Sequence, residues 1–134
     1  MENEQKSESI IAKKAYSFAL EIIKLYKHLI ADKKEFVLSK QLLRSATSIG
    51  ANINEALAGQ SKKDFVYKLN IALKEARETS YWLNLLKDSD YIPFSEFNNL
   101  NAFCTEIIKI LNSIIITTKE KYFGVVRSTL NSKL

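Results

Sequence analysis

The stretch that decides the fold is Arg44-Ser-Ala-Thr-Ser-Ile-Gly-Ala-Asn-Ile-Asn-Glu-Ala56. Apolar residues recur through and around it every three or four positions, the spacing of one buried helical face: Leu42, Ala46, Ile49, Ile53 and Leu57. A polar row with the same spacing contains Arg44, Ser48, Asn52 and Glu55. The positions between are small, although Ser, Thr, Asn and Gly are poor helix formers. We therefore expect a helix packed tightly on a neighbour, with its polar row engaged.

The rest of the chain predicts three more helices. The 134 residues include only three Gly and one Pro, which leaves room for long helices and little else. Apolar three-four spacing predicts helices over about 9–32, 39–58, 61–87 and 95–121. The cleanest heptad lies in the third: Phe65, Leu69, Ala72, Ala76, Thr79, Leu83 and Leu86. Short connections between four such helices predict an all-α fold, an antiparallel up-down-up-down four-helix bundle.

The chain is expected to be a single domain over residues 1–134, with a short flexible N-terminus (1–7) and a C-terminal tail (122–134). The tail keeps apolar residues up to Leu130, so we expect it to dock on the bundle. Ser39 or a residue just before it should cap the second helix. Gly59 should form a left-handed cap at its end, and Asp64 should pair with Lys68 in the third helix.

Composition limits the cellular setting and the partners. The net charge of +5 is modestly basic, which permits an acidic partner such as nucleic acid without requiring one. Cys104 is the single cysteine, so no intrachain disulfide forms and a reducing compartment is the simpler interpretation. The polar N-terminus does not resemble a signal peptide, and no uncharged apolar run appears long enough to span a bilayer. We expect a cytoplasmic protein with no membrane partner.

No catalytic or cofactor chemistry is evident in the sequence. A di-metal bundle needs Glu-x-x-His pairs, but the one histidine, His28, has no acidic residue three positions before it. One His and one Cys provide no zinc cluster, and the scattered glycines form no phosphate loop. Cys104 lies on an apolar stripe, which favours a buried, inert thiol over a nucleophile. We expect no enzyme activity, no metal and no cofactor.

Glu75 and Glu78 lie beside the heptad of the third helix and need partners on a half-buried face. Arg44 and Arg77 can supply them. One interpretation is an ion-pair network that joins the second and third helices. The other is a contact between subunits, and the two are compatible. We call the residues concerned the polar stripe: Arg44, Ser48, Asn52, Glu55, Glu75 and Glu78.

Lysines along the first helix and its exit are the candidates for contact with nucleic acid: Lys13, Lys14, Lys24, Lys27, Lys33, Lys34 and Lys40. Lysines contact phosphates without reading sequence. For a lone monomer, a solvated bundle face is the favoured explanation of these lysines. In a ring of subunits, the same residues would form a continuous basic surface.

Three segments of the sequence resemble a known family: Leu42 to Ala56, Ser61-Lys-Lys-Asp-Phe65, and Ile71 to Leu83. Together they resemble the four-helix-bundle proteins encoded by intervening sequences in bacterial 23S rRNA genes, which are related to the accessory variability protein of diversity-generating retroelements. The resemblance implies a bundle, ring-like oligomers such as a pentamer, and no catalysis. It places the family's signature on Arg44, Ser48, Ile49, Asn52, Ile53, Glu55, Ala72 and Glu78. Many relatives have Gly where this chain has Ala56.

The sequence thus predicts a non-enzymatic, homo-oligomeric four-helix bundle, most simply a pentamer, that binds or scaffolds RNA or an RNA–protein complex. The alternative is a protein–protein adaptor with no role in nucleic-acid binding. A third hypothesis, a small-molecule binder that uses the polar stripe, requires a pocket where the second and third helices meet.

Overall fold

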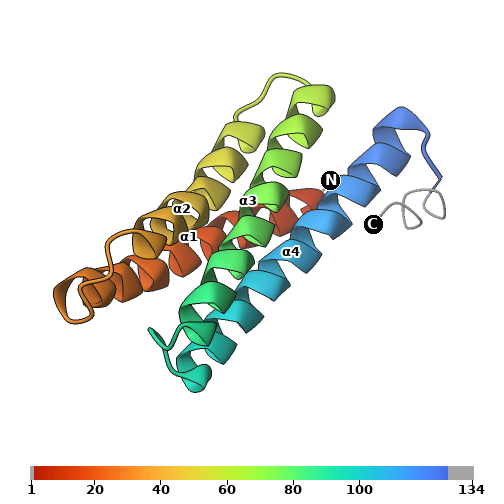
Figure 1. The fold of residues 1–134 in the computed structure, drawn as a ribbon. Helices are drawn as coiled ribbons and strands as arrows, with labels where there is room; N and C mark the ends of the chain where they lie inside the picture. Colours follow the sequence, from red (N-terminus) through yellow and green to blue (C-terminus); the bar gives the residue numbers. More distant parts are fainter. Residues whose placement is uncertain (1, 127–134) are drawn as a thin grey trace.

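The computed structural model describes residues 2–126. Its helices are α1 (Glu2–Ala31), α2 (Leu38–Leu57), α3 (Lys62–Asp88) and α4 (Phe94–Phe123). Each helix runs antiparallel to the one before it (Figure 1). α2 packs against α1 and α3, while α4 packs against α3 and closes on α1. The predicted all-α, up-down-up-down four-helix bundle is confirmed.

The core is built from the apolar faces that the three-four spacing predicts. All seven residues of the α3 heptad are buried, and so are Ile49 and Ile53 of α2. From α1, Phe18 is fully buried and meets Phe103 of α4 edge-on, with ring centroids 5.3 Å apart. Aromatic pairs favour this geometry, and it fixes α1 against α4.

The helix ends differ from the expectations in several places. α1 begins at Glu2, so residues 2–7, expected to be a flexible segment, form its first turns. α4 begins directly after Pro93. Proline has no backbone N–H to donate, which is no loss at the start of a helix, where the first N–H groups have no partner within the helix. At its other end, Gly124 has φ +63° and forms a left-handed cap. Most of the tail expected to dock, including Leu130, lies outside the described residues.

The N-terminus of α2 is capped from outside the helix, not by Ser39. The carboxylate of Glu35 accepts hydrogen bonds from the backbone N–H groups of Val37, Leu38 and Ser39, at 3.1, 2.8 and 2.6 Å. The Ser39 hydroxyl donates in return to the Glu35 carbonyl at 2.7 Å. Burial alone would raise the pKa of Glu35, but the backbone donors outweigh it and hold this pKa below its usual value. One buried carboxylate therefore sets where α2 starts.

Gly59 does not form the expected left-handed cap. α2 ends through Ala58, which keeps helical angles, and among the glycines only Gly124 has positive φ. A Cβ on Gly59 would lie 2.6 Å from the Asp64 carboxylate and 3.1 Å from the Ala56 carbonyl oxygen. A side chain at this position would have to displace the Asp64 carboxylate and would crowd the Ala56 carbonyl, so the turn into α3 favours glycine. The Ser61 hydroxyl then caps α3 by accepting from the Asp64 N–H at 3.0 Å.

One helix among residues 2–126 meets the length and composition of a membrane-spanning helix, although charged residues interrupt it. This is α4, with a mean hydropathy of 1.4 over its most apolar window. Leu100, Cys104, Ile107 and Leu111 of α4 are buried in the bundle, and a core helix shows the same apolar character.

The Glu35 cap leads to a prediction about stability and pH. Because the pKa of Glu35 is lowered by folding, its stabilisation is complete above the unfolded pKa and is lost as the pH falls through the folded pKa. Glu35→Gln should lower the free energy of unfolding by about 1–2 kcal/mol at neutral pH. The difference from wild type should shrink at acidic pH. Urea unfolding, followed by circular dichroism at several pH values, measures both effects.

Glu21→Gln is the matched control, because Glu21 is exposed and forms no ion pair or hydrogen bond within residues 2–126. It should leave the unfolding free energy nearly unchanged. A Glu35→Gln protein as stable as this control at neutral pH would show that the cap contributes nothing.

Candidate functional site

The polar stripe lies along the line where α2 and α3 meet. Arg44 on α2 extends its guanidinium to two carboxylates of α3. Its Nη1 is 3.3 Å from Glu75 Oε2, and its Nη2 contacts Glu78 Oε1 at hydrogen-bond range. Glu78 Oε1 also accepts from Trp82 Nε1 at 3.1 Å. The predicted ion-pair network between these helices is present, and it includes Trp82.

Arg77, the other expected partner, takes no part in this network. It is exposed and forms no ion pair within residues 2–126. Arg44 and the two carboxylates are themselves partly exposed, with 46% of the arginine side chain accessible against 19% for Glu75 and 36% for Glu78. Water therefore screens the pairs, which makes them weaker than a buried salt bridge.

Glu55, at the far end of the stripe, also links α2 to α3. Its carboxylate lies 3.0 Å from Lys68 Nζ, and this hydrogen bond raises the pKa of Lys68. The sequence predicted Asp64 as the ion-pair partner of Lys68, and this prediction is wrong. The Lys68 ammonium pairs instead with Glu55, which projects toward it from α2. Ion pairs thus join α2 and α3 near both ends of the stripe.

Ser48 and Asn52 are half-buried, and their hydrogen bonds stay within α2. The Ser48 hydroxyl donates to the Arg44 carbonyl at 2.7 Å, and Asn52 Nδ2 donates to the Ser48 carbonyl at 2.8 Å. Such bonds satisfy the side chains without a partner helix. The two residues are neither free in water nor bonded to α3, so they fill the groove between the ion pairs.

The direct hydrogen-bonding contact between the buried faces involves two residues that were not predicted as site residues. The hydroxyls of Ser45 and Thr79 lie 2.9 Å apart, and both residues are fully buried. The signal was present in the sequence, because Thr79 interrupts an otherwise apolar heptad opposite a serine. On the other side of α2, a Cβ added to Gly50 would lie 3.6 Å from the Ala15 Cβ of α1. The small residues of α2 therefore allow close contact with both neighbouring helices.

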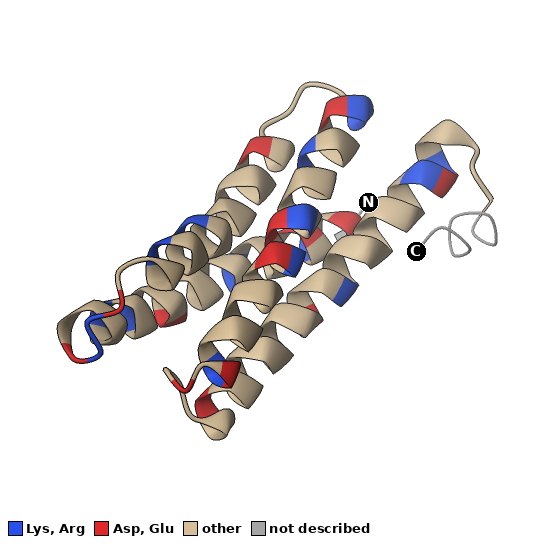
Figure 2. Ribbon diagram, in the orientation of Figure 1, with Lys and Arg blue, Asp and Glu red and all other residues tan. Residues whose placement is uncertain are grey.

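The candidate lysines divide into exposed and paired groups. Lys13, Lys24 and Lys27 lie on the exposed side of α1, and Lys33, Lys34 and Lys40 are exposed at its exit. Lys14 is different, because it forms an ion pair with Glu106 of α4. Figure 2 shows basic positions gathered toward the end of the bundle where α1 passes into α2, with acidic positions among them.

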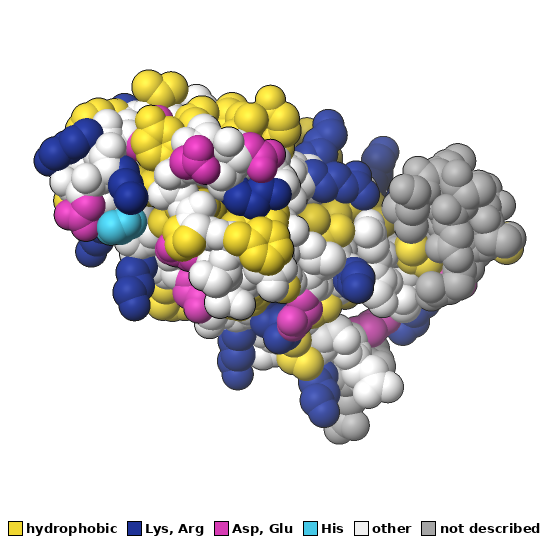
Figure 3. All heavy atoms as spheres, turned by 60° about the horizontal axis from the view of Figure 1, so that its bottom comes forward, with side chains coloured by type: hydrophobic (Ala, Val, Ile, Leu, Met, Phe, Trp, Pro, Cys, Tyr) yellow, Lys and Arg dark blue, Asp and Glu magenta, His cyan; other side chains and the backbone are white. Residues whose placement is uncertain are grey.

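Two of those carboxylates are already engaged. Asp32 Oδ2 lies 2.7 Å from His28 Nδ1, and Glu35 caps α2. Lys24 has acidic neighbours, since it lines a cleft of about 480 Å³ between α1 and α4 together with Glu21 and Glu96. On the face in Figure 3, basic side chains are spread widely, and hydrophobic side chains reach the surface between them. One chain therefore offers a modest, dispersed basic surface.

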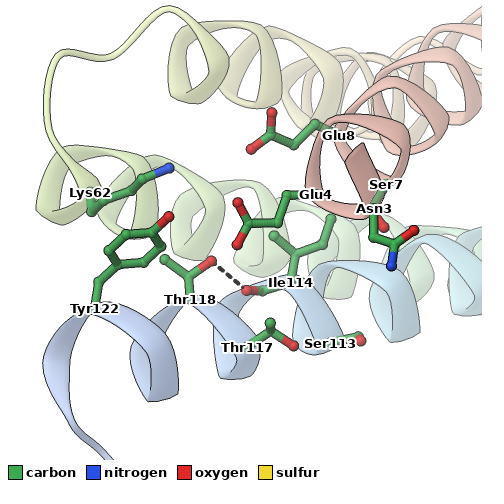
Figure 4. A pocket seen from close by; sticks show the side chains of 10 residues that line it. All are labelled: Asn3, Glu4, Ser7, Glu8, Lys62, Ser113, Ile114, Thr117, Thr118 and Tyr122. Atoms are coloured by element: carbon green, nitrogen blue, oxygen red, sulfur yellow. Dashed lines mark hydrogen bonds between the residues drawn. The ribbon is translucent and has the colours of Figure 1, made fainter. Parts of the chain in front are cut away.

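A cavity of about 140 Å³ lies between the N-terminal turns of α1, the start of α3 and the end of α4 (Figure 4). Glu4, Glu8 and Lys62 point into it, facing the Thr117 and Thr118 hydroxyls of α4. Glu4 Oε1 is 2.9 Å from Lys121 Nζ, and this hydrogen bond lowers the pKa of Glu4 and raises that of Lys121. The ion pair ties the first turns of α1 to α4, which explains why the helix continues to Glu2.

The residues with catalytic potential are arranged as the sequence predicts. Cys104 is fully buried, and its Sγ donates to the Ala76 carbonyl at 3.1 Å. Burial raises the pKa of the thiol to about 12, so it stays protonated at neutral pH. His28 is exposed and far in sequence from Cys104. No cluster of three or more His, Cys, Asp or Glu suited to a metal occurs within residues 2–126.

The hypothesis of a small-molecule site on the polar stripe gains no support. The cavity in Figure 4 and the α1–α4 cleft are lined by none of the six stripe residues. A third cavity, of about 220 Å³, lies at the turn between α2 and α3 and is also lined by other residues, including Gly59 and Phe65.

The partial exposure of Arg44 gives a prediction about its contribution to stability. A fully buried pair broken by truncation would cost about 3–5 kcal/mol. Because these groups are screened, Arg44→Ala should lower the free energy of unfolding by only about 1 kcal/mol. Arg77→Ala, which removes an exposed arginine without an ion pair, should change it by less than about 0.5 kcal/mol. Equal stability of the two variants in urea unfolding would show that the network is not stabilising.

Comparison with known proteins agrees with this architecture. A solved structure, described as a protein with unknown function from the S23 ribosomal protein family of Bacteroides thetaiotaomicron VPI-5482, superposes with a TM-score of 0.81. It shares 53% sequence identity with this chain, and the alignment covers 81% of this chain and 97% of that one. No curated protein matches. Residues 7–113, which span α2, α3 and most of α1 and α4, match the family described as 23S rRNA-intervening sequence protein, and the chain belongs to that family.

Proposed function

We propose that this chain is a non-enzymatic, homo-oligomeric binding or scaffolding protein that associates with RNA or an RNA–protein complex. The observation that carries the proposal is the unpaired basic row of α1 and its exit. Lys13 and Lys27 lie on one exposed side of the helix, and the row continues through Lys33, Lys34 and Lys40. The nearby carboxylates of Asp32 and Glu35 are engaged within the protein. Phosphates are the partner that such a row fits best.

Oligomerisation strengthens the argument for RNA. The lysines of one chain are few and dispersed, so a single copy would bind weakly. A closed ring repeats the row around a common axis and multiplies the field that attracts a polyanion. We propose a pentamer. The exposed residues Ala51 and Asn54 of α2, with Ala58 directly after it, support a contact between copies there, because small side chains let helices approach closely.

The family's description supports the proposal further, because it links these proteins to intervening sequences of 23S rRNA. The rival function, a protein–protein adaptor whose positive charge is incidental, predicts the same fold and also no catalysis. The two functions differ in how binding responds to salt, since only phosphate contacts release condensed counterions.

The test measures binding of a fluorescently labelled RNA hairpin by anisotropy at several salt concentrations. Wild-type affinity should fall log-linearly with salt, and Lys13→Gln should reduce the slope by about 1 for each subunit that contacts the RNA. The matched control is the neighbouring Lys14→Gln, which removes a charge that Glu106 already balances, and its slope should stay unchanged. Light scattering of the free protein should give about five times the mass of one chain.

Absence of RNA binding at low salt would contradict the RNA function and favour the adaptor. Binding with an equal slope for Lys13→Gln and Lys14→Gln would place the phosphates elsewhere on the molecule. A monomeric mass would contradict the oligomer.

A further inference from the structure

The outward face of α3 carries a row of side chains that neither the core nor the polar stripe uses. Positions 63, 67, 70, 74, 77 and 81 follow a four-three spacing, so they form one straight line along the helix. We call this line the α3 outer stripe; it consists of Lys63, Tyr67, Asn70, Lys74, Arg77 and Tyr81. Tyr67 and Tyr81 are 56% and 58% exposed, which is high for residues of their size. Two aromatic and three basic side chains are therefore interspersed along one largely exposed helix face.

The charge of the stripe has one sign. Lys63, Lys74 and Arg77 are exposed, and none of them forms an ion pair with another residue in the 2–126 range. Three carboxylates of α3 adjoin the stripe in sequence. Asp64 follows Lys63, while Glu75 and Glu78 are both bound to Arg44 on the side facing α2. The three basic side chains of the stripe stay exposed and are therefore available to phosphates.

Each tyrosine ring contacts a neighbouring residue that is itself bonded to a carboxylate of the polar stripe. Tyr81 meets Trp82 edge-on, with centroids 5.1 Å apart, and Trp82 is hydrogen-bonded to Glu78. Lys68 lies 5.9 Å from the centroid of Tyr67 and is itself bonded to Glu55. The polar stripe therefore supports both rings from the side facing α2. A ring that is ordered before binding loses less entropy when a ligand stacks on it.

We propose that the α3 outer stripe binds single-stranded RNA, with unpaired bases stacked on Tyr67 and Tyr81 and phosphates contacted by Lys63, Lys74 and Arg77. Stacking on aromatic side chains within a basic groove or face is how many proteins hold single strands regardless of sequence. The rings are separated by 14 positions, or about 21 Å along the helix. That distance corresponds to about six nucleotides at the stacked rise of a single strand.

The observations favour unpaired RNA over other partners. A protein partner would use Tyr and Arg, but lysine is depleted at protein interfaces, and the charges here lack any complement on the chain. A duplex offers phosphates but keeps its bases inside the stack, so it leaves the two rings unused. The inference rests on the proposed association with RNA but uses a different helix from the α1 lysines.

The experiment compares an unstructured RNA of about 12 nucleotides with an RNA duplex of the same length, both labelled and titrated at low salt. Tyr67→Ala/Tyr81→Ala should weaken binding of the single strand at least tenfold and change duplex binding by less than about threefold. Tyr67→Phe/Tyr81→Phe keeps the rings and should bind the single strand like wild type. Tyr16→Ala, which removes an exposed tyrosine from α1, should also bind like wild type.

Each outcome separates this inference from the proposed function. If wild type binds RNA with the expected salt dependence and the double alanine variant binds it equally well, the α3 inference is overturned while the RNA function stands. If Lys13→Gln leaves the salt dependence of RNA binding unchanged but the double alanine variant no longer binds the single strand, the α3 site is supported and the α1 site is contradicted. If the double alanine variant has a smaller mass in solution than wild type, the stripe is a contact between subunits, and the inference is overturned. Failure of wild type to bind either RNA removes both.

Discussion

Close contact between α2 and its two neighbours is the constraint on which the rest of this bundle depends. On one side, Gly50 faces Ala15 of α1 so closely that an added Cβ would already lie at van der Waals contact, 3.6 Å from the Ala15 Cβ, and a longer side chain would meet α1. On the other, the hydroxyls of Ser45 and Thr79 meet at 2.9 Å in the buried interface with α3. Interiors are packed nearly as densely as organic crystals, so larger side chains here would force the helices apart. Small residues that are poor helix formers are thus required within a single chain.

The same contact determines what the surface presents. With α2 and α3 held close, Arg44 reaches both Glu75 and Glu78, and Glu55 reaches Lys68. These pairs are partly exposed and add little stability individually, yet they engage all three carboxylates along this edge. Among the described residues, exposed lysines and arginines without an ion pair include those on the outer sides of α1 and α3. The ion pairs therefore affect the charge of this surface more than they stabilise the fold, and the exposed basic residues are those we propose for RNA binding.

Periodicity predicted the four helices, their order and nearly all of the core, because burying one face requires apolar residues every three or four positions. It also placed Arg44 opposite Glu75 and Glu78. It failed where a contact depends on the exact distance between elements. The Glu35 cap, the close turn at Gly59 and the choice of Glu55 over Asp64 by Lys68 all arise from tertiary proximity, which sequence spacing does not report. The outer stripe of α3 was missed because its tyrosines read as part of an ordinary exposed helix face.

Substitution at Gly50 tests the close contact most directly, through the free energy of unfolding in urea. Gly50→Ala adds a Cβ at ordinary contact distance from Ala15 and removes a glycine from mid-helix, so it should be as stable as wild type or more stable, by up to about 1 kcal/mol. Gly50→Leu should push α1 away and lose about 1–3 kcal/mol. Lys40→Leu, on the exposed side of α2, should differ little from wild type. A Gly50→Leu protein as stable as the Lys40→Leu control would contradict the account, because α1 and α2 would then not need to approach closely at this point.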